Sequence, residues 1–105
     1  MNDLRVEVVD SGSALELTIH GPATVAVANA LQERLMEALL GADKDVVVNV
    51  DTVEKLDGAG LQLLFAIKAS VERRGSSFAL VASEGAALRA IQLAGADALL
   101  GGGVP

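Results

Sequence analysis

Residues 45–64 read DVVVNVDTVEKLDGAGLQLL, and this stretch decides the fold. Its first part, 45–50, is rich in valine and lacks clean alternation between apolar and polar residues, which is typical of a parallel strand covered on both faces. Its last part begins at Asp57, a residue type that caps helices, and continues with leucines at helical spacing. Residues 51–56 lie between the two parts as a loop. The stretch therefore predicts a strand, a loop and a helix, with the strand in the middle of an α/β sheet.

Upstream of this stretch, the sequence predicts a β-hairpin. Two segments with alternating apolar residues, 5–9 and 14–20, flank the turn-forming residues 10–13. Gly21-Pro22 ends the second strand. Its His20 lies on the strand face away from the apolar residues, so we expect this side chain to point toward solvent or a covering loop.

Three helices are indicated by their start and stop signals. Thr24 caps the first, which runs through Leu40 and ends at Gly41. Arg73-Arg74-Gly75 ends the second, a basic last turn followed by glycine. After a short strand at 78–82, Ser83 caps the third helix and Gly95 ends it. The apolar positions of the second helix include Leu61, Leu64, Phe65, Ile67 and Val71.

This order of elements predicts an α/β fold with a mixed sheet of four to five strands and three to four helices. Its central strands are parallel, with right-handed crossovers, and the N-terminal hairpin forms an antiparallel edge. No linker divides the 105 residues. We therefore predict one domain over 1–105, with a core over about 4–100 and a flexible tail at 101–105. The loops after the parallel strands gather at one rim. These loops are residues 21–25, 51–60 and 82–85.

The composition excludes several classes of function. The chain has 51% hydrophobic residues, no cysteine and one histidine, which removes disulfide frameworks and zinc sites built from cysteine and histidine. A net charge of −6 repels nucleic acid and anionic membrane surfaces. No segment has the roughly 20 apolar residues of a membrane span, and the N-terminus lacks the pattern of a signal peptide. We expect a cytoplasmic protein without direct membrane insertion.

Catalytic and metal-binding roles also find little support. The hydroxyl groups of Thr24, Thr52 and Ser83 lack a neighbouring base in the sequence pattern, and a lone His20 is more often a surface residue than a catalytic one. Asp51 and Asp57 could be taken for a metal pair, but a loop carboxylate and a helix cap are the favoured roles. We predict no enzymatic activity, no metal site and no cofactor.

The start of the second helix is the most informative surface. Gly58, Ala59 and Gly60 follow the capping Asp57, and residues this small allow another backbone to come close. Bare helix N–H groups can bind anions, but Asp57 would occupy those donors and repel phosphate. Two interpretations remain: a capped helix start whose small residues permit close internal packing, or a contact surface for another protein.

The run Asp57-Gly58-Ala59-Gly60-Leu61 resembles the Asp-Ser-Ser-Gly-Leu signature of STAS domains, the anti-sigma factor antagonist module. The succession of strands and helices over roughly residues 4–100 is also similar to that family. The resemblance implies a non-catalytic partner-switching module of bacterial signalling. Its second-helix N-terminus would dock on a partner protein. The contact residues so implied are Thr24, Thr52, Asp57, Gly58, Ala59, Gly60 and Gln62.

The chain departs from the antagonist pattern at the regulatory positions. Gly58 occupies the position of the family's phosphoserine, and Ala59 follows, so neither position carries a hydroxyl group. Thr24 stands where the family often has an acidic residue. Thr52 is an alternative phosphosite, because phosphate there would add about −1.5 to −2 charge beside the acidic rim. An unmodified surface threonine is the default interpretation.

Two kinds of partner are compatible with these residues. The run from Asp57 to Leu64 is similar to STAS proteins that accompany bacterial chemosensory gene sets, which favours an anti-sigma kinase-like or chemosensory partner. It is also similar to STAS subunits of lipid-transporting ABC systems, for which the partner is a transporter ATPase. Self-association as a homodimer is a further expectation, through the strand at 5–9 or the bare helix start.

Overall fold

The computed structural model describes residues 4–40 and 43–100. Within these residues, strands and helices follow the predicted order with one additional strand. The strands are β1 (Arg5–Asp10), β2 (Ala14–Ala23), β3 (Asp45–Asn49), β4 (Val53–Leu56) and β5 (Phe78–Val81). The helices are α1 (Ala28–Leu39), α2 (Gly58–Arg73) and α3 (Ala86–Leu93), with short 3-10 helices η1 (Val25–Val27) and η2 (Asp97–Leu99). Two predictions, the helix end at Gly41 and the flexible tail at 101–105, lie outside the described residues.

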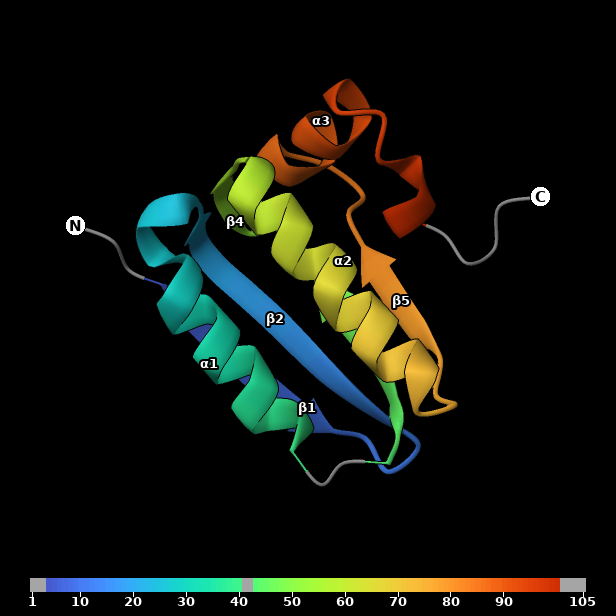
Figure 1. Cartoon of the computed structure of the whole chain (residues 1–105). Coiled ribbons are helices and arrows are strands. Elements are labelled where there is room, and N and C mark those ends of the chain that lie inside the picture. The colour runs from blue at the N-terminus through green and yellow to red at the C-terminus, as the bar shows by residue number, and fades with distance from the viewer. Residues whose placement is uncertain (1–3, 41–42, 101–105) are drawn as a thin grey trace.

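The strands form one mixed sheet in the order β1-β2-β3-β5, with β4 beside the end of β2. β1 pairs with β2 antiparallel, whereas β2 pairs with β3 and with β4 in parallel, and β3 pairs with β5 in parallel. Figure 1 shows α1 and α2 side by side on one face of this sheet, with α3 near β4 at one end. The predicted mixed sheet with an N-terminal hairpin edge is confirmed.

The prediction that the central strand is covered on both faces is wrong. Val46 and Val48 of β3 are buried at 1% and 0% exposure, but Val47 and Asn49 on the other face remain partly exposed. The crossovers from β2 to β3 and from β3 to β5 move in the same direction along the sheet. Because such crossovers are right-handed, both helices lie on the same face.

The second strand is longer than predicted. We expected Gly21-Pro22 to end this strand, but β2 continues through both residues to Ala23. A register shift between Gly21 and Pro22 accommodates them in the strand. Its extension pairs with β4, so the predicted loop at 51–56 contains a strand. Val53 and Leu56 of β4 are buried and the two residues between them are exposed. A strand this short shows no alternation for the sequence to reveal.

Only one of the three predicted N-caps exists as predicted. Asp57 caps α2 with its side chain. Thr24 precedes η1 without a side-chain cap, so the first helix proper begins at Ala28. Ser83 does not cap α3, because this helix begins after Gly85. The Ser83 hydroxyl donates instead to the Asp51 carboxylate. The predicted end of α2 is confirmed: Gly75 has a φ of 89° and its N–H donates to the Glu72 carbonyl.

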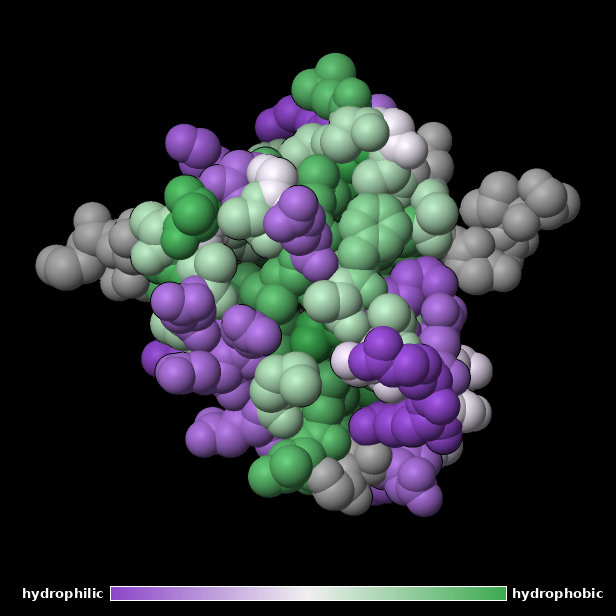
Figure 2. Space-filling view, in the orientation of Figure 1, coloured by the Kyte–Doolittle hydropathy of each residue, from purple (hydrophilic) through white to green (hydrophobic). Residues whose placement is uncertain are grey.

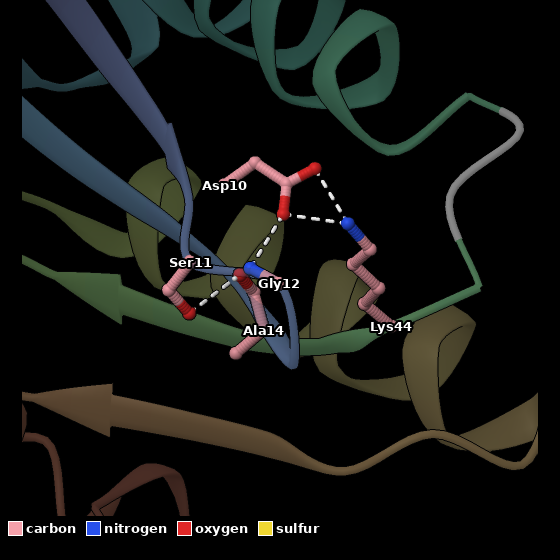
Figure 3. Close-up of polar contacts among 5 residues, drawn as sticks. All are labelled: Asp10, Ser11, Gly12, Ala14 and Lys44. Atoms are coloured by element: carbon pink, nitrogen blue, oxygen red, sulfur yellow. Dashed lines mark hydrogen bonds and ion pairs between the residues drawn. The ribbon is translucent and has the colours of Figure 1, made fainter.

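The hairpin turn at residues 10–13 lies at the end of the sheet opposite to the rim (Figure 1), and Lys44 contacts Asp10 there (Figure 3). The Gly12 N–H donates to Asp10 Oδ1 at 2.9 Å, and the Ser11 hydroxyl donates to the Ala14 carbonyl at 3.1 Å. Lys44 Nζ lies 2.5 Å from both Asp10 oxygens, and this hydrogen bond lowers the pKa of the Asp10 carboxyl. These contacts join the hairpin to the start of β3.

The core lies between the sheet and the helices that cover it. Leu17 and Ile19 of β2 are fully buried, as are Leu35 of α1 and Val71 of α2. On the opposite face of β2, His20 Nε2 lies 2.7 Å from Glu7 Oε1. His20 therefore points away from the core, as predicted. Among the described residues, no helix is long and apolar enough to cross a lipid bilayer.

Candidate functional site

The rim predicted from the sequence is assembled around the first turn of α2. Three loops meet there: the residues that follow β2, the turn between β3 and β4, and the turn between β5 and α3. Two aspartates, Asp57 and Asp51, join these loops by accepting hydrogen bonds from their backbone N–H groups. In Figure 1 this region lies at the upper end of the sheet, where η1, the start of α2 and α3 come together.

Asp57 caps two helical segments with one carboxylate. Its Oδ1 accepts a hydrogen bond from the Gly60 N–H at 3.1 Å, and its Oδ2 accepts one from the Val25 N–H at 3.0 Å. The backbone hydrogen bond from Val25 is the main reason that the pKa of this carboxyl is lowered, and that from Gly60 comes next. The carboxylate thus ties η1 to the start of α2 and favours its own charged form.

Asp51 joins the end of β3 to the turn before α3. Its Oδ2 accepts from the Ser83 hydroxyl at 2.8 Å, and its Oδ1 accepts from the N–H groups of Ser83 at 2.7 Å and Glu84 at 3.3 Å. The Ser83 hydroxyl is the main cause of the lowered pKa of Asp51. Asp51 and Asp57 are therefore a loop carboxylate and a helix cap. In residues 4–40 and 43–100, no group of three or more metal-ligating side chains gathers.

Thr52 lies on the exposed side of the rim, but its hydroxyl group points inward. Thr52 Oγ1 donates to the Ile19 carbonyl at 2.8 Å, and the Thr52 carbonyl accepts from the Gly21 N–H at 3.3 Å. These bonds join the turn before β4 to β2. Phosphate transfer to Thr52 would require this hydroxyl to leave the Ile19 carbonyl.

The two glycines of the first turn of α2 have different surroundings. A Cβ atom added to Gly60 would overlap the Ala23 carbonyl oxygen and would lie 2.6 Å from Leu56 Cδ1. A Cβ atom added to Gly58 would meet nothing within 4 Å. Gly60 therefore serves close internal packing of α2 on β2 and β4, whereas Gly58 leaves the outer side of the helix start open.

The outer side of α2 carries an uncharged, mainly apolar stripe, which we call the apolar stripe and define as Gly58, Gln62, Phe65, Ala66 and Ala69. All five residues are exposed, with Phe65 at 41%. The first charged residue of α2 is Lys68, whose Nζ lies 2.7 Å from Glu72 Oε2. Figure 2 shows apolar side chains over the N-terminal part of α2 and hydrophilic ones at its far end.

Phe65 is one of the apolar positions that indicated a helix in the sequence, but it does not lie on the buried face of that helix. The buried face of α2 consists of Gly60, Leu63, Leu64, Ile67 and Val71. The spacing of the small and apolar residues along the helix was the signal that could have shown this. Positions 60, 64, 67 and 71 follow one helical face, and position 65 lies about 100° away from position 64. Phe65 therefore lies on the exposed side of α2.

The predicted contact residues all lie on or directly beneath this rim. Thr52, Gly58 and Gln62 are exposed, and Thr24, Asp57 and Ala59 are partly exposed. Gly60 is buried, so its part in any contact is indirect, through the position of α2. Next to η1, Val25 adds an apolar side chain at 73% exposure.

Comparisons with known proteins identify the class that this fold and rim define. Residues 6–101 match the family model described as "Mlab, STAS domain", and the chain belongs to the STAS domain family. No curated protein matches the chain in sequence.

Solved structures of anti-sigma factor antagonists share the fold. One from Mycobacterium paratuberculosis is 23% identical with a TM-score of 0.80, over 93% of this chain and 83% of that one. The antagonist SpoIIAA in its unphosphorylated form is 10% identical with a TM-score of 0.73, over 92% of this chain and 86% of that one. An antagonist STAS domain from Rhodobacter sphaeroides is 20% identical with a TM-score of 0.57, over 74% of this chain and 83% of that one.

Proposed function

We propose that this STAS domain is a non-catalytic interaction module of bacterial cytoplasmic signalling, which binds a regulatory protein through the start of α2. The apolar stripe on α2 is the observation that carries the proposal. A helix that packs one face on a sheet normally presents charged residues to water. Here ten residues from Gly58 to Ile67 contain no charge on either side of the helix. A partner surface that covers the stripe would remove apolar area from water.

The surroundings of the stripe suit docking better than catalysis. Asp57 and Asp51 use their oxygens for internal hydrogen bonds, and the Thr52 hydroxyl donates to a backbone carbonyl. A nucleophile needs a neighbouring base to accept its proton. His20 is the one histidine of the chain, and it contacts Glu7 on the open face of the sheet, not the hydroxyl groups of the rim. These polar groups hold the loops in place around the stripe.

The partner that we favour is an anti-sigma kinase-like or chemosensory protein. Solved relatives named as anti-sigma factor antagonists share the fold, and this supports a regulatory partner of that kind. Gly58 and Ala59 lack the hydroxyl group that a serine kinase would modify. We therefore propose docking that is not switched at these two positions, with Thr52 as the remaining phosphosite on the surface.

An accessory role on a transporter ATPase is the second candidate. The lack of a hydroxyl group at Gly58 and Ala59 favours it, because a permanently docked subunit needs no phosphorylation switch. Copurification from the native cell, followed by identification of the bound protein, separates the two candidates. A kinase-like or chemosensory protein supports the first, and an ATPase of a transport system supports the second.

The docking surface is tested by Gly58→Trp. Because this position is open, we expect the free energy of unfolding to change by no more than about 0.5 kcal/mol. A tryptophan in the centre of the contact should weaken binding by about 2 kcal/mol, or roughly 30-fold. Phe65→Ser should also lower affinity by removing apolar contact area.

Ser77→Trp is the matched control, because Ser77 is exposed just before β5, at the end of the sheet opposite to the rim. This variant should retain both stability and binding. The readouts are thermal melting and affinity for the copurified partner. Normal partner binding by folded Gly58→Trp and Phe65→Ser variants would show that the partner docks elsewhere.

A further inference from the structure

A second surface lies on the opposite side of α1 from the stripe. β1 is an edge strand, paired only with β2 over the described residues, so its outer backbone groups have no strand partner. Figure 1 shows β1 at the margin of the sheet behind α1. Val8 and Val9 are exposed at 48% and 57%. An exposed edge of this kind is a template for pairing with another strand.

The residues of β1 separate into two faces with distinct chemistry. The register with β2 places Val6 and Val8 opposite the buried Ile19 and Leu17, and therefore on the face covered by the helices. Arg5 and Glu7 alternate with them and lie on the open face of the sheet. Each β1 edge thus presents a positive and a negative side chain two residues apart.

We propose that two copies of this chain form a dimer by antiparallel pairing of their β1 strands, with the two-fold axis at Val6. Residues directly opposite each other in an antiparallel pair lie on the same face of the sheet. In this register Arg5 of each copy faces Glu7 of the other, which gives two opposite-charge pairs. Val6 faces Val6 of the second copy on the helix side. The inference is independent of docking at the start of α2.

Charge selects this register over its neighbours. A two-fold axis at Glu7 would place the two Glu7 side chains opposite each other, and like charges in this position are destabilising. An axis at Val8 would place Asp10 opposite Val6, which pairs a charge with an apolar side chain and leaves Arg5 unpartnered. A register halfway between residues would place side chains of different faces opposite each other, which antiparallel pairing does not allow. Among these registers, only the axis at Val6 places both Arg5 and Glu7 opposite an unlike charge of the second copy, and Glu7 keeps its contact with His20 of its own chain.

The helix layer leaves room for this pairing. Val8, on the helix side of β1, is 48% exposed, so α1 does not cover the outer edge of this strand completely. Continuing the sheet across β1 would bring the two α1 helices side by side over the newly paired strands. A groove of about 280 Å³ between β1 and α1 would then join its symmetry mate. Its lining residues are Val6, Val8, Ala38, Arg34 and Glu37. Arg34 and Glu37 carry opposite charges and lie one turn apart on α1.

Charge reversal tests the proposal by sedimentation velocity at low salt. Arg5→Glu places two carboxylates opposite each other, and Glu7→Arg places two guanidinium groups opposite each other, so each variant alone should lose about tenfold or more in dimer affinity. In an equimolar mixture, one copy of each variant can pair with the other. The two carboxylates of the Arg5→Glu copy then face the two guanidinium groups of the Glu7→Arg copy, so the mixture should dimerise again. Arg89→Glu and Glu84→Arg are the matched controls, because both positions are exposed and lie far from β1, and they should dimerise like the native chain.

A cysteine at the two-fold axis tests the register. The native chain has no cysteine, so Val6→Cys should form a covalent dimer on mild oxidation, whereas Val8→Cys should not. A disulfide formed by Val8→Cys in preference to Val6→Cys would overturn the register. A native chain that stays monomeric at its highest soluble concentration would overturn the dimer and leave the edge to another protein's strand. Unaltered dimerisation of both charge variants would place self-association on another surface.

Discussion

The inner and outer sides of the first turn of α2 are built from the same kind of residue for opposite purposes. On the inner side, Gly60 is buried, and a methyl group in place of its hydrogen atom would overlap the Ala23 carbonyl oxygen. On the outer side, Gly58 faces open space. The sequence left open whether the small residues here permit close internal packing or form a contact surface. Gly60 fits the first interpretation, and Gly58 is compatible with the second. The helix start combines tight internal packing with a surface that another protein can approach.

Gly60→Ala should have the largest effect on stability. The added methyl group would force α2 away from the backbone of Ala23 and the side chain of Leu56. Overpacking of this kind costs about 1–3 kcal/mol, and the upper part of that range is expected because the obstructing atom is backbone. Denaturant unfolding measures the change. A loss below about 0.5 kcal/mol would show that α2 can shift without cost and that the inner side is not tightly packed.

Asp57→Ala should have the next largest effect, because it removes the bonds to Gly60 on the inner side and Val25 on the outer side together. Asp57→Asn keeps one acceptor oxygen and should be intermediate in stability. The folded-state pKa of Asp57 is lowered, so its stabilisation is present above the unfolded-state pKa and lost as the pH falls through the folded-state value. The stability difference between the native chain and Asp57→Asn should therefore shrink between pH 7 and pH 3.

The measurement for Asp57 is urea unfolding across this pH range. Because the folded-state pKa values of Glu7, Asp10 and Asp51 are also lowered, the difference between the two chains isolates Asp57 from these groups. Equal stability of Asp57→Asn and the native chain at every pH would contradict the double cap.

Thr52→Val should have a smaller effect, because it removes one hydrogen bond to the Ile19 carbonyl. The expected loss is about 0.5–1.5 kcal/mol of unfolding free energy. Thr52→Ser keeps the hydroxyl group and should retain most of the stability. If serine at this position destabilises and valine does not, the methyl group and not the hydroxyl is responsible.

Gly58→Ala should have the smallest effect and the opposite sign to Gly60→Ala. Its backbone conformation suits any residue and its Cβ position is open, so alanine should raise stability by about 0.4–1 kcal/mol through a less flexible unfolded chain. The same thermal or denaturant unfolding experiment gives both values. Destabilisation by Gly58→Ala would remove the distinction between the inner and outer sides.

The amino-acid pattern alone was sufficient for the order of all the main elements except β4 and for the cap at Asp57, because these depend on local spacing and on one carboxylate next to a helix start. It was also sufficient to bring the loops around Thr24, Thr52 and Asp57 to one rim, because carboxyl ends of parallel strands meet at the same edge of a sheet. The family resemblance carried by residues 57–61 led to the same fold.

Tertiary structure decided the features that depend on partners distant in the sequence. Gly60 became a packing residue because β2 runs on through a bulge to Ala23 and pairs with β4, and no local pattern contains that contact. Ser83 binds Asp51, 32 residues away, although its position before a helix predicted a cap. Phe65 is exposed because the orientation of α2 against the sheet, and not hydrophobicity, selects which apolar residues are buried. Local spacing determines where a helix begins, whereas the strands and loops packed against it determine which of its sides faces water.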